Sequence, residues 1–312
     1  MQKLIVLTGP TAVGKSKLSI ELAKRIGGEI ISADSMQVYK YMDIGTDKIT
    51  KEKMDGVPHH LIDFLEPTED FNVFMFQKLV KEAINDIASR GKVPIIVGGT
   101  GFYIQAVLYD IDFTETDEDE TYRHELEQLA EKEGVHVLHE MLQEIDPESA
   151  LAIHENNSKR VIRALEYYKK TGKPISEHNK EQHERTSPYD FRYFVLTDER
   201  KTLYSRIDKR VDQMMEEGLL EEVRELKKLN IPKTATSMQS LGYREIMGYL
   251  DGEYDLERAV YLIKLNTRHF AKRQLTWFRR ERDVIWIDKN NFDHNDDLIL
   301  KEMIRIYEQG NV

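Results

Sequence analysis

The sequence predicts an α/β fold built on a parallel β-sheet, because short apolar strands alternate with helical segments in its first hundred residues. Residues 3–8 (KLIVLT) form an apolar run rich in β-branched side chains, which is typical of a buried parallel strand. The glycine-rich segment 9–16 follows, and apolar residues then recur at helical spacing over 17–26. This order of strand, glycine-rich turn and helix favours an α/β protein.

Two further buried strands are expected at 29–33 and 93–97, with an amphipathic helix at 74–89 between them. Asp34 directly follows the second strand, and Gly98, Gly99, Thr100 and Gly101 end the third. Ligands of parallel sheets bind beyond the carboxyl ends of the strands. The sequence therefore predicts a binding site where these three loops meet.

The character of the chain changes after about residue 112, which divides the predicted fold into two parts. Five acids in six positions at 115–120 (ETDEDE) suggest a solvated connector, and 122–190 has helical patterns. The apolar run 191–196 is expected to return to the sheet, and helices dominate from residue 203 onward. We therefore predict a core of residues 1–113 and 190–312, with a helical C-terminal part, and a helical insertion domain at 114–189.

The 312 residues have a hydrophobic fraction of 40%, a net charge of −11 and no cysteine. The lack of cysteine excludes disulfides, thiolate zinc sites and cysteine nucleophiles. No apolar run approaches the roughly 18 residues of a membrane span, so a cytoplasmic protein is expected. The negative charge argues against nucleic acid as a partner, but residues 268–282 hold six Lys or Arg against one Glu. One basic docking surface is compatible with an acidic chain.

Residues Gly9–Ser16 (GPTAVGKS) match the phosphate-loop pattern G-x-x-x-x-G-K-[ST] in full. In such a loop, backbone N–H groups and the start of the next helix face the phosphates. Lys15 adds a point charge for phosphate oxygens, and the Ser16 hydroxyl can reach magnesium. The alternative is a chance loop, which the flanking strand and helix disfavour. The motif indicates a bound di- or triphosphate, but it does not imply hydrolysis of ATP.

Asp34 and Thr100 are the candidate polar groups on the neighbouring loops. Asp34 either caps a following helix or turns its carboxylate to the phosphate site, as a general base or an outer magnesium ligand. Gln37 carries an amide that could pair with the edge of a base. Thr100 lies in GGTGFYIQA (98–106), where the alternative to a substrate contact is a simple strand-to-helix turn.

Two basic clusters could contact phosphate. The first is Lys159, Arg160 and Arg163 on a predicted helix, which taken alone is more simply a solvated face. The second lies on a helix near 258–280, where Arg268, Lys272 and Arg279 share one stripe, Arg273 and Arg280 form another, and Trp277 and Phe278 lie between them. Aromatic residues interleaved with Arg and Lys suit contacts to phosphate and unstacked bases. The alternative is a helix whose charges pair with the acidic remainder.

Taken together, six motifs resemble those of the tRNA dimethylallyltransferases, also called tRNA isopentenyltransferases: GPTAVGKS (9–16), DSMQVYKYMDIGTDK (34–48), GGTGFYIQA (98–106), NSKRVIRALE (157–166), SMQSLGYREI (237–246) and TRHFAKRQLTWFR (267–279). The resemblance runs from residue 4 to about residue 280. It implies a P-loop core related to nucleotide kinases and a helical insertion. The zinc-finger tail of eukaryotic members is missing, as the lack of cysteine requires, so the bacterial form is expected.

The resemblance implies transfer of a dimethylallyl group from dimethylallyl diphosphate to the exocyclic N6 amine of the adenosine 3′ of the tRNA anticodon. Magnesium at Ser16 would assist, and diphosphate would be released; a monomer binding the anticodon stem-loop is expected. Asp34 would be the base, with Lys15 and Thr100 beside it. The diphosphate would lie on Gly9, Thr11, Ala12, Val13, Gly14, Lys15 and Ser16. Contacts to tRNA would come from Asp34, Ser35, Met36, Gln37, Thr100, Arg123, Lys159, Arg160, Arg163, Gln239, Gly242, Tyr243, Arg244, Lys272, Arg273, Gln274, Trp277 and Arg279.

Three other functions remain compatible with parts of the sequence. A small-molecule kinase would use the phosphate loop for ATP but leaves the basic helix without a purpose. An isopentenyltransferase for free adenine nucleotides needs no RNA-docking surface. A non-catalytic RNA-binding regulator would not need Lys15, Ser16 and Asp34 together.

Overall fold

The computed structural model describes residues 1–113 and 120–309, and the chain divides into two compact units. Unit 1 comprises Met1–Leu108 and Pro188–Val312, and unit 2 comprises Tyr109–Ser187. The sequence placed the same two boundaries at 113/114 and 189/190, a few residues further along the chain. Most of the acidic run expected as a connector, residues 115–119, lies outside the described residues.

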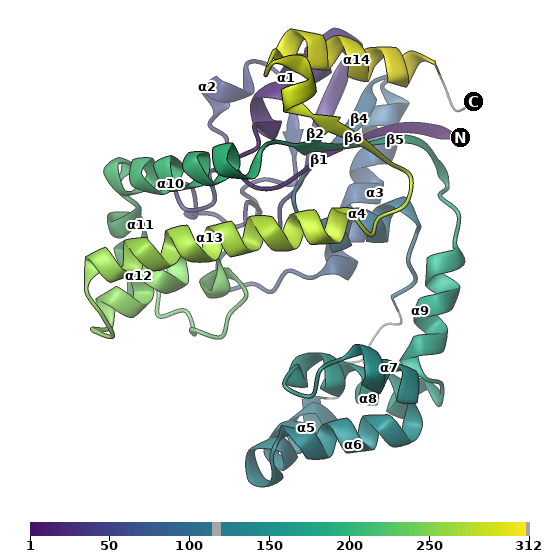
Figure 1. Cartoon of the computed structure of the whole chain (residues 1–312), viewed down its shortest axis with the longest axis vertical. Helices are drawn as coiled ribbons and strands as arrows, with labels where there is room; N and C mark the ends of the chain where they lie inside the picture. Colours follow the sequence, from purple (N-terminus) through teal and green to yellow (C-terminus); the bar gives the residue numbers. More distant parts are fainter. Residues whose placement is uncertain (114–119, 310–312) are drawn as a thin grey trace. The chain divides into compact units, whose positions relative to one another are not determined.

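Unit 1 is built on a six-stranded sheet in the order β3-β2-β4-β1-β5-β6, in which every pair of neighbours is parallel (Figure 1). The strands are β1 (Gln2–Thr8), β2 (Gly28–Ala33), β3 (His59–His60), β4 (Val93–Gly98), β5 (Tyr189–Thr197) and β6 (Val284–Asp288). The predicted α/β fold with a parallel sheet is confirmed. The sequence did not predict the edge strands, because β3 has only two residues and most of β6 is incompletely buried.

Helices cover both faces of this sheet. Figure 1 shows α1 (Lys15–Ile26) and α14 (Asp296–Glu308) on one side, and α3 (Val73–Ser89) and α4 (Gly101–Leu108) on the other. Leu18 and Leu22 of α1 belong to one buried apolar cluster with Ile5 of β1. The helix therefore forms where its apolar stripe meets a strand that is buried on both faces.

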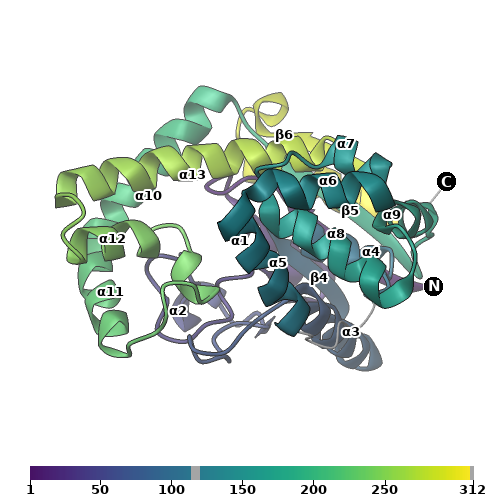
Figure 2. The same ribbon diagram turned by 90° about the horizontal axis from the view of Figure 1, so that it is seen from below.

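A second group of helices in unit 1 follows β5. It consists of α10 (Arg200–Glu217), α11 (Leu219–Lys228), α12 (Tyr243–Leu250) and α13 (Leu256–Phe278), and Figure 2 shows α10 crossing behind α13, with which it is in contact. The short elements of this unit are α2 (Lys51–Met54), η1 (Ser237–Gln239) and η2 (Lys289–Phe292). Across the described residues, no helix combines the length and the apolar character needed to cross a bilayer.

Unit 2 is a small helical domain. Its helices are α5 (Glu120–Glu133), α6 (Val135–Ile145), α7 (Pro147–Ala152), α8 (Ser158–Thr171) and α9 (Ile175–Glu184). Leu138 and Leu142 of α6 pack with Val161 and Leu165 of α8 in a core of their own. Asp146 joins α7 to α9, because its carboxylate accepts hydrogen bonds from the backbone N–H groups of Ser149 at 3.0 Å and Ser176 at 2.9 Å.

The order of the central strands brings three loops together at one edge of the sheet. In the strand register, Gly98 at the end of β4 is paired with Thr8 at the end of β1 and with Ala33 at the end of β2. The segments after these residues are the phosphate loop, the segment that begins at Asp34 and the segment that contains Thr100. The sheet therefore gathers the motifs that the sequence predicted to form a site.

Candidate active site

The phosphate loop joins β1 to α1 and is fixed by its backbone conformation. Gly9 has a φ of 144°, and a Cβ at this position would lie 2.5 Å from the carbonyl oxygen of Leu196. Any side chain at Gly9 would therefore displace the loop from β5. Val13 is fully buried and anchors the middle of the loop, while Gly14 precedes the first turn of α1. The N–H groups at the start of α1 thus face the loop, an arrangement suited to anions.

Lys15 lies in the first turn of α1, and its ammonium group rests on the loop. Its Nζ donates hydrogen bonds to the carbonyl oxygens of Gly9 at 3.0 Å and Pro10 at 2.9 Å. Burial, assisted by the nearby Arg210 guanidinium, lowers the pKa of Lys15 to about 8, although the Asp34 carboxylate acts in the opposite direction. A bound anion would stabilise the charged form of this lysine and raise its pKa.

Asp34 follows β2, and no helix begins there, so the helix-cap interpretation of this residue is not what the structure contains. Its Oδ1 accepts the N–H of Met36 at 2.9 Å, which closes a local turn. The next residue, Ser35, donates its N–H to Oγ1 of Thr100 at 3.3 Å. The loops after β2 and β4 are thereby joined, and Thr100 helps to orient the segment that carries Asp34.

Two neighbouring cavities open at this edge of unit 1. The loop cavity, of about 470 Å³, is lined among others by Thr11, Ala12, Gly14, Lys15, Ser16, Asp34, Gln37, Thr46, Asp47, Arg206, Arg210 and Gln274. The helix cavity, of about 300 Å³, is lined among others by Asp34, Ser35, Met36, Gly45, Thr46, Thr100, Arg210, Met214, Gln239, Gly242, Arg244, Ile263, Phe270, Arg273 and Gln274. Both cavities include Asp34, which lies at their junction.

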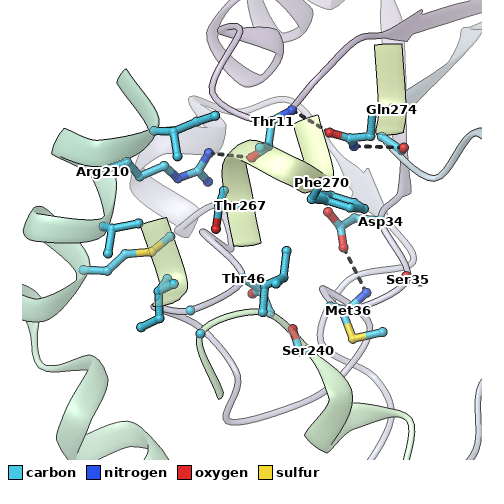
Figure 3. Close-up of a pocket in the computed structure, with 18 of the residues that line it drawn as sticks. Thr11, Asp34, Ser35, Met36, Thr46, Arg210, Ser240, Thr267, Phe270 and Gln274 are labelled. Atoms are coloured by element: carbon cyan, nitrogen blue, oxygen red, sulfur yellow. Dashed lines mark hydrogen bonds between the residues drawn. The ribbon is translucent and has the colours of Figure 1, made fainter. Parts of the chain in front are cut away.

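Figure 3 shows the helix cavity, with Thr11, Arg210 and Gln274 along one side and Thr46 and Ser240 along the other. The hydrogen bonds drawn there connect the phosphate loop to both α10 and α13. The walls of the cavity are therefore contributed by segments that are far apart in the sequence.

Arg210 of α10 is a candidate binding residue that the sequence analysis missed. Its guanidinium forms an ion pair with Asp47, and Nη1 lies 3.4 Å from Oγ1 of Thr11. Burial lowers the pKa of Arg210 to about 10, and the Asp34 carboxylate acts in the opposite direction. Within the described residues its buried Nε has no hydrogen-bond partner. A half-buried cation beside a phosphate loop suits an anionic ligand, but no motif spacing in the sequence distinguishes Arg210 from other helix arginines.

Gln37 and Gln274 both line the loop cavity, and each also makes hydrogen bonds within the protein. The Gln37 amide donates to the carbonyl oxygen of Thr46 at 3.2 Å, and its oxygen accepts from Oγ of Ser32 at 3.2 Å. In this structure it therefore holds the chain around Thr46, where the sequence suggested contact with a base. Gln274 lines both cavities and bonds to the phosphate loop.

The motif 237–246 forms one rim of the helix cavity. Gln239 donates a hydrogen bond to the carbonyl oxygen of Lys233 at 2.5 Å, and Gly242 precedes α12 with a φ of 92°. Arg244 is partly exposed and bonds to Glu245 at 2.8 Å. The side chain of Tyr243 is fully buried, so it supports the rim from behind and is not positioned to contact a macromolecule directly.

The basic face of α13 remains accessible. Lys272 and Arg279 are exposed, and neither makes an ion pair within the described residues, whereas Arg268 is paired with Asp208 at 2.5 Å. Arg273 lies over the ring of Phe270, 5.7 Å from its centroid. The Trp277 indole packs edge-on against Phe102, with ring centroids 6.2 Å apart. One face of the helix therefore packs, while Lys272, Arg273 and Arg279 face solvent.

In unit 2, the basic cluster of Lys159, Arg160 and Arg163 lies at the beginning of α8. Lys159 and Arg160 are exposed and Arg163 is half-buried, and in the described chain none of the three is ion-paired. The first turn contains no acidic residue, and Asn157 does not cap it with its side chain. Cations at the positive end of a helix are unfavourable without an anion, so this end favours a negatively charged partner. Arg123, in contrast, forms two hydrogen bonds of 2.9 Å with Glu166.

The loop cavity contains oxygen donors that fit magnesium. The exposed Ser16 hydroxyl and the Asp34 carboxylate line the same cavity. No group of three or more His, Cys, Asp or Glu is arranged around a metal site in the part of the chain that is described. Magnesium usually combines one or two protein oxygens with water and substrate phosphates, so this sparse donor set fits an ion brought together with a diphosphate.

The parallel sheet, the loop after β1 and the helix that follows it define a protein with a P-loop NTPase-like fold. Comparison with known proteins narrows this class. Residues 37–281 match the family described as IPP transferase, and residues 2–67 match the family described as isopentenyl transferase. The chain belongs to the IPP transferase family, which includes the tRNA dimethylallyltransferases, and it is a prenyl-transferring enzyme.

Individual relatives support this assignment over nearly the full length. The chain is 60% identical to the tRNA dimethylallyltransferase of Lachnoclostridium phytofermentans, covering 100% of this chain and 99% of the relative. A crystal structure of a tRNA isopentenylpyrophosphate transferase from Bacillus halodurans is 48% identical, with a TM-score of 0.74. The match covers 99% of this chain and 98% of that chain. The structure of a eukaryotic dimethylallyltransferase acting on tRNA is 34% identical, with a TM-score of 0.80. The match covers 92% of this chain and 74% of that chain. The resemblance seen in the sequence motifs is confirmed.

Proposed function

We propose that this enzyme transfers a dimethylallyl group from dimethylallyl diphosphate to the exocyclic N6 amine of the adenosine immediately 3′ of a tRNA anticodon. The observation that carries the proposal is the position of Asp34 at the junction of two cavities. One cavity contains the phosphate loop and suits a diphosphate. The other is bounded by the motif 237–246 and by α13, and it suits the acceptor base.

The donor diphosphate would bind in the loop cavity. Backbone N–H groups of the loop, the Lys15 ammonium and the Arg210 guanidinium supply positive charge on different sides of it. Negative charge develops on the leaving diphosphate as its bond to the allylic carbon breaks, so fixed donors at this place lower the barrier. Mg²⁺ held by Ser16 and the diphosphate would neutralise further charge when bound.

The dimethylallyl group needs an apolar environment beside the diphosphate. Ile207, Val211 and Met214 of α10 and Ile263 and Phe270 of α13 line the helix cavity. Their side chains would exclude water from the electron-poor allylic carbon, which would otherwise react with water in place of the amine. The adenine ring of the acceptor would lie in the same cavity, next to Asp34.

Asp34 would act as the general base. A bond forms between N6 and the allylic carbon, the carbon–oxygen bond breaks with its electron pair leaving on the diphosphate, and a proton leaves N6. Oδ1 of Asp34 is engaged by the N–H of Met36. Oδ2 accepts no hydrogen bond from the described residues and can take the proton. A carboxylate is a sufficient base because the amine becomes acidic as its new bond forms.

The tRNA would dock on the exposed cations of both units. Lys272, Arg273 and Arg279 of α13 and Lys159 and Arg160 of α8 are exposed, and contacts from them to phosphate would allow a chain of net charge −11 to bind RNA. The target base must leave its stack to reach Asp34, and unstacking costs least in a loop. On this proposal unit 2 is a tRNA-contacting insertion, and the protein acts as a cytoplasmic monomer.

The test is incubation of the protein with labelled dimethylallyl diphosphate and, in separate reactions, unmodified tRNA, AMP or ATP. Magnesium is supplied in one set and removed with a chelator in another. The proposal expects label on tRNA only, with diphosphate released in equal amount, and a loss of transfer without the metal. Label on AMP or ATP would instead identify an enzyme for free nucleotides, and conversion of ATP to ADP without transfer of label would identify a kinase.

A further inference from the structure

The carboxylate of Glu222, on α11, accepts four hydrogen bonds. Oε2 accepts the backbone N–H groups of Asp43 at 3.0 Å and Ile44 at 2.8 Å. Oε1 accepts the N–H of Gly45 at 3.2 Å and the hydroxyl of Tyr243 at 2.5 Å. An ionised carboxylate offers about four lone-pair positions, so this group is saturated, and only its charged form can accept all four bonds.

The segment bound by Glu222 has no regular secondary structure to hold it. Residues 43–47 lie between β2 and α2, and the ends of the segment are fixed by side chains. Gln37 donates to the carbonyl oxygens of Thr46 at 3.2 Å and Asp47 at 3.3 Å. Glu222 is the group that satisfies the three consecutive N–H donors at its start, which belong to the exposed Asp43 and the half-buried Ile44 and Gly45. Without this carboxylate the start of the segment would lose its attachment to α11.

Tyr243 completes the packing of this segment. A Cβ on Gly45 would lie 2.4 Å from Cε2 of the Tyr243 ring, so the ring lies directly against the glycine backbone. Burial and the Glu222 carboxylate raise the pKa of the Tyr243 hydroxyl, and it therefore remains a hydrogen-bond donor. The carboxylate thus joins the motif 237–246 to the segment that follows Asp34.

Residues 43–47 form a wall shared by the two cavities. Gly45 and Thr46 line the helix cavity, Thr46 and Asp47 line the loop cavity, and Asp47 forms the ion pair with Arg210. Glu222 is not among the residues that line either cavity. Its influence on either ligand must pass through the wall that it holds.

We propose that Glu222 is a positioning residue, which fixes residues 43–47 and, through Asp47, the Arg210 guanidinium at the diphosphate. The inference rests on the proposed function, because it assigns Arg210 to the donor and Gly45 and Thr46 to the side of the acceptor base. It predicts that a change at the Glu222 carboxylate, which lines neither cavity, alters both the diphosphate site and the site of the acceptor base. A displacement of catalytic groups by about 1 Å can lower a rate about 100-fold.

The decisive variant is Glu222→Gln, which keeps the shape of the side chain but offers only one acceptor oxygen. Hydrogen exchange of peptides covering 43–47 should become at least about tenfold faster, and the affinity for inorganic diphosphate with magnesium should fall severalfold. The matched control is Glu221→Gln, since Glu221 is exposed on the same helix and pairs with Arg224. The control should match the parent protein in both measurements. Neither readout requires transfer activity, so they still test Glu222 if the proposed reaction is not observed.

A kinetic cycle separates positioning from a general loss of structure. Glu222→Gln should lower kcat/KM for tRNA modification by about 10-fold to 100-fold. Asp47→Asn should also lower kcat/KM, because it weakens the contact between residues 43–47 and Arg210. The fold-decrease in kcat/KM of the double variant should then be smaller than the product of the fold-decreases of the two single variants. Multiplicative losses, or exchange at 43–47 equal to that of the parent, would overturn the proposal. If Glu222→Gln does not fold, Tyr243→Phe removes one of the four bonds, and unchanged exchange in that variant would also overturn it.

Discussion

Gln274 binds Thr11 across 263 residues of sequence: its Oε1 accepts the N–H of Thr11 at 2.9 Å. The other end of the same amide donates to the carbonyl oxygen of Gly99 at 3.0 Å. A single side chain of α13 therefore joins the phosphate loop to the loop after β4. The helix that carries the exposed cations is in this way attached to the loop that suits the diphosphate.

Replacing Gln274 by Leu removes both bonds while nearly keeping the volume of the side chain. Two half-buried polar groups lose their partner, at a cost of about 0.5–1.5 kcal/mol each, and the phosphate loop should shift. We expect severalfold weaker binding of dimethylallyl diphosphate and little change in tRNA affinity, both measured by calorimetric titration. Thr276→Ala, an exposed change on the same helix, is the control. Weaker tRNA binding with unchanged diphosphate affinity would show instead that Gln274 contacts tRNA.

Asp34→Asn tests the assignment of the base. The amide oxygen can still accept the N–H of Met36, so the turn should persist, but the group can no longer take a proton. The rate of transfer should fall by about 10²–10⁴-fold, while both substrates still bind. Single-turnover kinetics with saturating substrates measures this step, and Asp293→Asn, at an exposed aspartate, is the control. A variant that retains transfer within a factor of a few would show that Asp34 is structural.

The sequence predicted the features of this fold and site that are local. β1, the phosphate loop and α1 follow from eight motif residues between an apolar strand and an amphipathic helix, and Asp34 and Thr100 follow from the rule that parallel strands present ligands at their carboxyl ends. The edge strands β3 and β6 were not predicted, because short, partly exposed strands lack the continuous apolar run of a central strand.

Arg210 and Glu222 were missed for a different reason. Each lies on an amphipathic helix among other charged residues, and only the tertiary packing gives it a special role. Arg210 comes close to Thr11 and Asp47, and Glu222 meets three N–H groups of residues 43–45. Their partners are distant in the sequence, so periodicity does not distinguish these side chains from solvated charges. Gln274 was identified, but its bonds to the loops were not, for the same reason.

The lowered pKa of Lys15 predicts how diphosphate binding depends on pH. In the free protein the pKa is about 8, and a bound anion raises it. Between pH 8 and the pKa of the complex, binding therefore takes up a proton, so affinity should fall as the pH rises, by up to about tenfold per unit. Titrations with dimethylallyl diphosphate between pH 7 and 10 measure the slope. Lys15→Met should bind more weakly and show a smaller slope, and an equal slope in both proteins would assign the proton to another group.

The exposed stripe of α13 predicts a steep salt dependence of tRNA binding in spite of the net charge of −11. Each phosphate contact contributes roughly 0.7–0.9 to the slope of log affinity against log salt. Lys272 and Arg279 are exposed and have no ion-pair partner in the described chain. Replacing both by Ala should lower the slope by between about one and two units and weaken tRNA binding at low salt.

The control for this measurement removes the same charge elsewhere. Lys301 and Arg305 of α14 are exposed and paired with Asp297 and Glu302, and replacing both by Ala changes the net charge equally. If only the total charge mattered, both double variants would lower the slope alike. If the α13 stripe contacts phosphate, only the first variant will do so. Its affinity for dimethylallyl diphosphate should remain that of the parent, and its thermal stability should change little, because exposed charges contribute about 0–1 kcal/mol each. Equal slopes for the α13 variant and the parent would mean that tRNA docks on another surface.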